Sequence, residues 1–162
     1  MVGTTVLYIG AENWPFPVPL VEKNGRWYFD SETGAQEIVF RRIGENEAMT
    51  IQLCRELAGG ASAKNGKDSQ AAVPKEPFHG YYFRALSAPT SARHGGENTS
   101  ALAYVAYPAA YRSSGVMTFI VNRNGEVYER DLGPNTTRLA RQIKRWPVSA
   151  WDAVQAAGNT GP

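Results

Sequence analysis

Residues 14–21 read Trp-Pro-Phe-Pro-Val-Pro-Leu-Val, and our expectation for the fold depends most on this stretch. Its bulky residues alternate with prolines, Trp14, Phe16, Val18 and Leu20 against Pro15, Pro17 and Pro19. In a strand, alternate side chains share a face, and a proline lacks the N–H that a neighbouring strand would need. We therefore predict an edge strand over residues 14–21 that buries its bulky side chains and cannot pair along its outer edge. The alternative is a polyproline II segment packed on aromatic residues.

The residues on either side of this stretch predict two more strands. Residues 4–10 are β-branched and apolar and are bounded by glycine, which is typical of a short strand. Asn24-Gly25 predicts a hairpin turn, because both residues tolerate a positive φ. The turn leads into residues 26–30, where Trp27 and Phe29 should share one face.

A helical pattern follows over residues 32–58, with Asp30 or Ser31 placed to cap its start. Gly44 and Asn46 interrupt the pattern, so we expect either two helices, with Asn46 capping the second, or one bent helix. Arg41 and Arg42 would then offset the dipole at the end of the first helix, or alternatively form an anion site. Cys54 is expected to be a buried apolar residue on this helix rather than a reactive thiol.

The second half of the chain is rich in predicted strands. Four segments are β-branched or aromatic in character, namely residues 78–86, 101–107, 115–121 and 126–132. Residues 115–121 are apolar on both faces and should form the central strand, and residues 122–125 should turn the chain into the next one. A short helix follows, which Asn135 should cap and Pro147 should stop. Its inner stripe is expected to be Leu139, Ile143 and Trp146.

These elements predict an α+β fold with a mostly antiparallel sheet and two or three helices. We expect one domain over residues 1–150, with a flexible connection at 59–77 and a frayed tail at 151–162.

Composition excludes several classes of protein. With 162 residues, of which 43% are hydrophobic, the chain can bury a core and is not wholly disordered. Its single cysteine excludes an intrachain disulfide and a cysteine-rich zinc site. The net charge of +2 is too small to imply nucleic acid, and no apolar run is long enough to span a membrane. No phosphate loop, nucleophile elbow or zinc-protease motif is present, so we expect neither a cofactor nor a metal.

Three groups of residues are candidates for binding or chemistry. Arg138, Arg141 and Arg145 lie on one face of the last helix, which is either a solvated surface or a patch for an anionic partner. His79 should share a strand face with Tyr81, packed and hydrogen-bonded, although it is also the candidate catalytic histidine. Aromatic residues could line a sugar- or peptide-binding surface or be ordinary half-buried sheet residues, and these are Tyr81, Tyr82, Tyr104, Tyr107, Tyr111, Trp14 and Trp27.

Three blocks of the sequence resemble a bacterial family of unknown function, the domain-of-unknown-function family numbered twenty-nine fifty. They cover residues 14–47, 79–86 and 101–136, and include the Trp-Pro-Phe-Pro string, the Arg-Arg-Ile-Gly-x-Asn-Glu block and Gly-Val-Met-Thr-Phe-Ile-Val-Asn. Members of this family carry an export signal as a rule, so the resemblance implies a periplasmic or secreted protein of the cell envelope. Residues 1–10 do not show the basic start and long apolar stretch expected of an export signal, and the middle around residues 59–77 is shorter than the resemblance leads us to expect. The second half is also weakly similar to the terminal sheet of pilin-like and pseudopilin domains.

Together these observations predict a non-enzymatic binding or structural module of the envelope, a monomer or weak oligomer with a protein or polymer partner. The candidate ligand-binding residues are Arg138, Arg141, Arg145, Tyr81 and His79. Two alternatives stay open. One is a hydrolase of envelope polymer that uses His79 with an acid from residues 30–37. The other is an anion-binding module that uses the basic helix.

Overall fold

The computed structural model describes residues 3–62, 73–86, 103–122, 124–144 and 150–154. The chain divides into two compact units, residues 1–44 and 45–162, and the boundary falls inside the long helix α1 (Ser31–Ser62). The single domain over residues 1–150 that the sequence suggested stays a prediction.

The N-terminal unit holds two small antiparallel sheets. In the first, β4 (Leu20–Lys23) lies between β1 (Thr4–Thr5) and β5 (Arg26–Phe29). The second is a hairpin of β2 (Tyr8–Ile9) and β3 (Trp14–Pro15). The predicted Asn24-Gly25 turn is confirmed, because it joins β4 to β5 with φ angles of 57° and 72°.

The predicted edge strand over residues 14–21 does not form as one strand. Only Trp14–Pro15 is strand before the chain bends, and β4 then pairs on both of its sides. Pro15 does lie in an edge strand, yet it sits opposite Tyr8, and Trp14 is 51% exposed instead of anchored inward. Because each proline removes a ladder donor, continuous pairing resumes only at Leu20, after the last proline. The single strand expected over residues 4–10 is likewise divided into β1 and β2.

Helix α1 runs without a break past Gly44 and Asn46, so the two-helix alternative is wrong. Asp30 caps its start as predicted: the Thr33 backbone N–H donates to Asp30 Oδ1 at 3.1 Å and the Thr33 hydroxyl to Oδ2 at 2.8 Å. Asn46 caps nothing, because its Nδ2 donates to the carbonyl of Ser114 at 2.9 Å. A helical glycine costs only about 1 kcal/mol, which the tertiary contacts of the following turns can offset.

The C-terminal unit is built on a five-stranded antiparallel sheet of order β10-β9-β8-β7-β6. Its strands are β6 (Tyr81–Leu86), β7 (Ala103–Pro108), β8 (Met117–Asn122), β9 (Val127–Asp131) and β10 (Asp152–Ala153). All four predicted strands are present, and β8 is central as predicted. The predicted turn after β8 is confirmed by the Gly125 N–H, which donates to the carbonyl of Asn122 at 3.0 Å. Although residues 151–162 were expected to fray, Val154 N donates to Val127 O at 2.9 Å beside β10.

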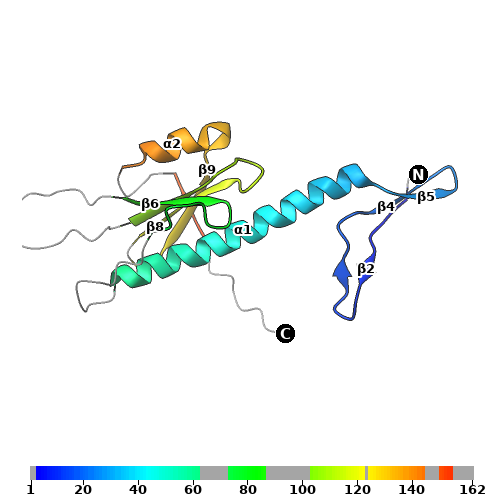
Figure 1. Ribbon diagram of the computed structural model, residues 1–162, viewed down its shortest axis with the longest axis horizontal. Helices are drawn as coiled ribbons and strands as arrows, with labels where there is room; N and C mark the ends of the chain where they lie inside the picture. The colour runs from blue at the N-terminus through cyan, green and yellow to red at the C-terminus, as the bar shows by residue number, and fades with distance from the viewer. Residues whose placement is uncertain (1–2, 63–72, 87–102, 123, 145–149, 155–162) are drawn as a thin grey trace, which may run out of the picture. The chain divides into compact units, whose positions relative to one another are not determined.

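The sheet of this unit has a core on each face, with helices on opposite sides (Figure 1). The α1 side buries Cys54, Leu57, Ala58, Tyr81, Phe83, Tyr104, Ala106, Phe119, Val121 and Val127. The other side buries Leu86, Ala103, Val105 and Ile120, with Ile143 and Trp151 packed against them. The confirmed fold class is therefore α+β.

Helix α2 (Thr136–Gln142) follows a short 3-10 helix, Gly133–Asn135, and differs from prediction at both ends. The Asn135 side chain makes no capping hydrogen bond, and the helix ends at Gln142 rather than at Pro147. The early end has a tertiary cause: Arg84 on β6 donates to the carbonyls of Ala140 and Ile143, at 2.9 Å and 2.6 Å. Leu139 and Ile143 are half-buried as the stripe predicted, whereas Trp146 and Pro147 lie outside the described residues. Of the flexible connection expected at 59–77, residues 59–62 belong to α1 instead, and residues 63–72 lie outside the described residues.

Candidate functional site

The N-terminal unit carries a line of aromatic side chains that we call the aromatic row: Trp14, Phe16, Phe29 and Trp27. The rings of Trp14 and Phe16 meet edge to face with centroids 6.4 Å apart, and those of Phe16 and Phe29 do so at 6.0 Å. Trp27 and Phe29 are two residues apart on β5, so their side chains share one face of the sheet. The segment with the three prolines thus supplies one half of the row, and the strand after the Asn24-Gly25 turn supplies the other.

Most of the aromatic row is open to solvent. Trp14, Trp27 and Phe29 are 51%, 53% and 54% exposed, and Phe16 is half-buried between them. Among the described residues, nine of the ten exposed large hydrophobic side chains lie between Val6 and Phe40. Isolated exposed apolar residues are ordinary on protein surfaces, whereas a concentration of aromatic ones in one small unit is typical of an interaction surface.

Arg41 holds one end of the row in place. Its guanidinium lies over the Trp14 ring, 5.3 Å from the centroid. The same group donates to the carbonyl of Pro15 at 2.6 Å and to the Glu37 carboxylate at 2.8 Å. Since α1 continues past it, Arg41 does not offset a helix end as expected. It instead joins the helix to β3 and neutralises its own charge against Glu37.

His79 does not lie on a strand, so the expectation of a packed strand histidine is wrong. It occupies the first position of a two-residue turn between Phe78 and Tyr81, with φ of 45°, and Gly80 follows at 70°. The side chain is exposed, and its ring meets that of Phe78 edge to face at 4.5 Å. In the part of the chain that the structure describes, no carboxylate forms an ion pair with it.

Tyr81 is fully buried and belongs to a network centred on Glu47. A single carboxylate oxygen, Glu47 Oε1, accepts the backbone N–H groups of Val116 and Met117 at 2.8 Å and 2.9 Å and the Tyr81 hydroxyl at 3.1 Å. Burial, and then the Glu47 charge, raise the pKa of Tyr81 well above its ordinary value. A buried phenol held in its neutral form stabilises the junction between α1 and β8, and it is not open to a ligand.

Cys54 is buried as predicted, and burial raises its pKa to about 12, so its reactive thiolate form is disfavoured. Within the described ranges, no group of three or more His, Cys, Asp or Glu residues could hold a metal ion. The helices described here include none that is both long and apolar enough to cross a membrane.

The predicted ligand-binding residues are not gathered at one place. Arg138 and Arg141 are exposed on α2, on the opposite side of the sheet from the buried Tyr81, and Arg145 lies outside the described residues. Among the predicted tyrosines, Tyr104 and Tyr107 are buried and Tyr82 and Tyr111 half-buried, so the ordinary sheet interpretation holds for them.

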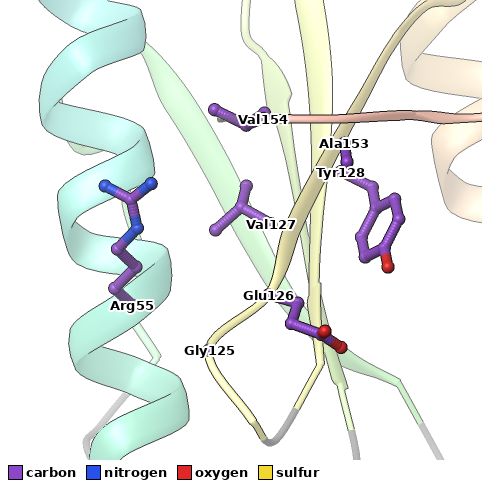
Figure 2. A pocket seen from close by; sticks show the side chains of 7 residues that line it. All are labelled: Arg55, Gly125, Glu126, Val127, Tyr128, Ala153 and Val154. Atoms are coloured by element: carbon purple, nitrogen blue, oxygen red, sulfur yellow. The ribbon is translucent and has the colours of Figure 1, made fainter. Parts of the chain in front are cut away.

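A pocket of about 250 Å³ lies between α1 and the part of the sheet where β9 pairs with β10. Figure 2 shows Arg55 reaching from α1 beside Val127 and Val154, while Tyr128 and Glu126 lie on the other side of β9. The lining residues are Arg55, Gly125, Glu126, Val127, Tyr128, Ala153 and Val154. This lining does not bring a nucleophile and a general base together, so the pocket suggests no reaction.

The sequence identified Trp14 and Trp27 as possible binding residues, did not include Phe29 among them, and suggested an offset to the helix dipole or an anion site rather than a ring contact for Arg41. The period-two pattern of β5 already placed Phe29 beside Trp27, so that signal was available. The contact of Arg41 with Trp14 was not, because it spans 27 positions of sequence and depends on how α1 packs on β3.

Comparison with known proteins gives one result. A profile of the family described as "Protein of unknown function (DUF2950)" matches the chain over residues 2–62 and 58–154. No curated protein and no solved structure matches the chain significantly, so the likeness to pilin-like domains is not confirmed.

Proposed function

The chain belongs to the family of proteins of unknown function DUF2950, and we propose that it is a non-enzymatic binding module whose aromatic row takes an uncharged polymer of sugar rings. The observation that carries this proposal is the exposure of Trp14, Trp27 and Phe29, of which Trp14 and Phe29 contact the half-buried Phe16. Rings such as these two, which are half-open to water and held by an edge-to-face neighbour, are ready to stack against a flat partner with little loss of side-chain entropy.

The charges of the N-terminal unit favour an uncharged partner. Residues 3–44 carry five acidic and four basic side chains, and the cation nearest the row, Arg41, is paired with Glu37. A surface with so little net charge gives no electrostatic attraction for a polyanion or a polycation. The C–H faces of sugar rings, which pack on aromatic rings while their hydroxyls stay in water, suit a surface that is apolar and nearly neutral.

Titration of the whole chain with soluble neutral oligosaccharides, followed by tryptophan fluorescence and calorimetry, tests this proposal. We expect saturable binding that Trp14→Ala or Trp27→Ala weakens by about tenfold or more, because stacking of one ring contributes about 1–3 kcal/mol. Tyr28→Ala is the matched control, since Tyr28 is 48% exposed but points to the opposite face of the same strand. Absence of binding by neutral oligosaccharides, or equal effects of Tyr28→Ala and Trp27→Ala, would overturn the proposal.

We also propose that the module works in the bacterial envelope, as a periplasmic or secreted protein. This part rests on the family resemblance and on the match to DUF2950. Fractionation of cells that express the natural gene tests it: the protein should be recovered with periplasmic or secreted markers, and recovery with cytoplasmic markers would contradict the proposal.

A further inference from the structure

Helix α2 lies in a long stretch of sequence that has no acidic residue. Between Asp131 and Asp152 the chain carries four cations, Arg138, Arg141, Lys144 and Arg145, and no carboxylate. Of these, Arg138 and Arg141 are exposed on α2 and three positions apart, which places them side by side on the helix surface. No acidic side chain of the helix itself can therefore neutralise them.

The sheet under α2 adds further positive charge to the α2 side of the C-terminal unit. Alternation along the strands places Arg84 and Arg130 on the α2 side, opposite Val105 and Thr118. The carboxylates of Glu129 and Asp131 fall on the α1 side, and Asp152 lies directly opposite Glu129. Glu126, which lies on the α2 side, is hydrogen-bonded to Asn122 at 2.5 Å near the hairpin end. The α2 face is thus the basic face of the C-terminal unit.

Two tyrosines lie on the face of the sheet under α2. Tyr107, and then Tyr82, raise the pKa of Arg141 above its ordinary value. The rings of Tyr107 and Tyr82 are cross-strand neighbours with centroids 5.7 Å apart.

We propose that Arg138 and Arg141 form a binding site for a linear polyanion that carries phosphate-type groups. The planar guanidinium fork matches two oxygens of such a group. Both side chains lie on an exposed helix surface, where a single small anion would gain little against water. A polymer presents several anionic groups to neighbouring cations at once and releases counterions when it binds, which is why the occupant is a polyanion. This basic surface belongs to the C-terminal unit, so its binding of a polyanion does not depend on the aromatic row.

Inorganic polyphosphate is the probe, titrated into the whole chain by calorimetry at several salt concentrations. We expect binding that weakens steeply with salt. Arg141→Gln should reduce affinity about tenfold and lower the salt slope by about one, because one charged contact is lost.

Arg55→Gln is the matched control, since it removes one exposed positive charge from the α1 side, and it should change affinity less than twofold. Arg141→Lys keeps the charge but loses the planar fork, so its affinity for polyphosphate should lie between those of the natural protein and Arg141→Gln. Circular dichroism establishes that each variant is folded. The proposal is overturned by no polyphosphate binding at low salt, or by equal effects of Arg55→Gln and Arg141→Gln.

Discussion

Removal of the Glu47 carboxylate should destabilise the C-terminal unit more than any other single change to an α1 carboxylate. Its Oε1 atom accepts two backbone N–H groups from the start of β8, at 2.8 Å and 2.9 Å, and the buried Tyr81 hydroxyl at 3.1 Å. Glu47→Ala leaves both N–H groups without this acceptor at a half-buried junction. The Tyr81 hydroxyl keeps a second partner, the carbonyl of Met117 at 3.0 Å, so most of the loss comes from the two N–H groups.

The magnitude follows from these contacts. A hydrogen bond to a charged group contributes about 1.5–3 kcal/mol, and partial access to water favours the lower end for each N–H. We therefore expect Glu47→Ala to lower the free energy of unfolding by about 3 kcal/mol. Glu47→Gln keeps an acceptor oxygen and loses only the charge, so about 1 kcal/mol is expected.

Urea unfolding of the whole chain, followed by far-UV circular dichroism, measures both variants. Glu45→Ala is the control, because Glu45 is exposed on the same helix two residues earlier, and it should cost less than about 0.5 kcal/mol. If Glu47→Ala were no more destabilising than Glu45→Ala, the carboxylate would not be the link between α1 and β8, and the assigned role of the network would be refuted.

Three further predictions follow from single side chains. Gly115→Ala should lower the free energy of unfolding by more than about 2 kcal/mol, because the new Cβ would lie 2.0 Å from the Tyr81 hydroxyl oxygen. Gly44→Ala, whose new Cβ would have nothing within 4 Å, should instead stabilise α1 by about 0.5–1 kcal/mol. Thermal unfolding compares the two variants, and similar effects would contradict the close approach at Gly115. Arg84→Met should speed amide hydrogen exchange in α2 by removing the donors to its last carbonyls, and unchanged exchange there would show that Arg84 does not hold the helix end. Burial, and then the charges of Glu47 and Asp152, raise the pKa of Glu129 in the folded protein. Protonated Glu129 therefore favours the folded state at pH values below its unfolded pKa, and this stabilisation is lost as the pH rises through its folded pKa. Glu129→Gln should raise the urea midpoint at neutral pH, and a lower midpoint would show that the Glu129 charge does not destabilise the fold.

The parts of the fold that depend on local pattern could be predicted from the sequence. Asn24-Gly25 specifies its turn through the positive φ of both residues, and the apolar stretch that became β8 was assigned correctly to the centre of the sheet. The Asp30 cap was also predictable, because a capping side chain acts on the backbone only three residues away.

Prediction was wrong where distant residues decide the outcome. Gly44 was expected to interrupt a helix, yet the turn that follows it is held by contacts of Asn46 and Glu47 with residues near 115, about 70 positions later. Helix α2 ends early because its carbonyls are bound by Arg84, which lies more than 50 positions before them. No local pattern can show either contact.

The candidate aromatic site divides in the same way. The residues alone show that Trp27 and Phe29 share a face and that the prolines deprive residues 14–21 of ladder donors. They do not show that Trp14 and Trp27 stay in contact with water while Tyr81 and Tyr104 are buried. An aromatic residue has the same local preference for a strand in either case, whereas its burial depends on whether another element covers that face of the sheet.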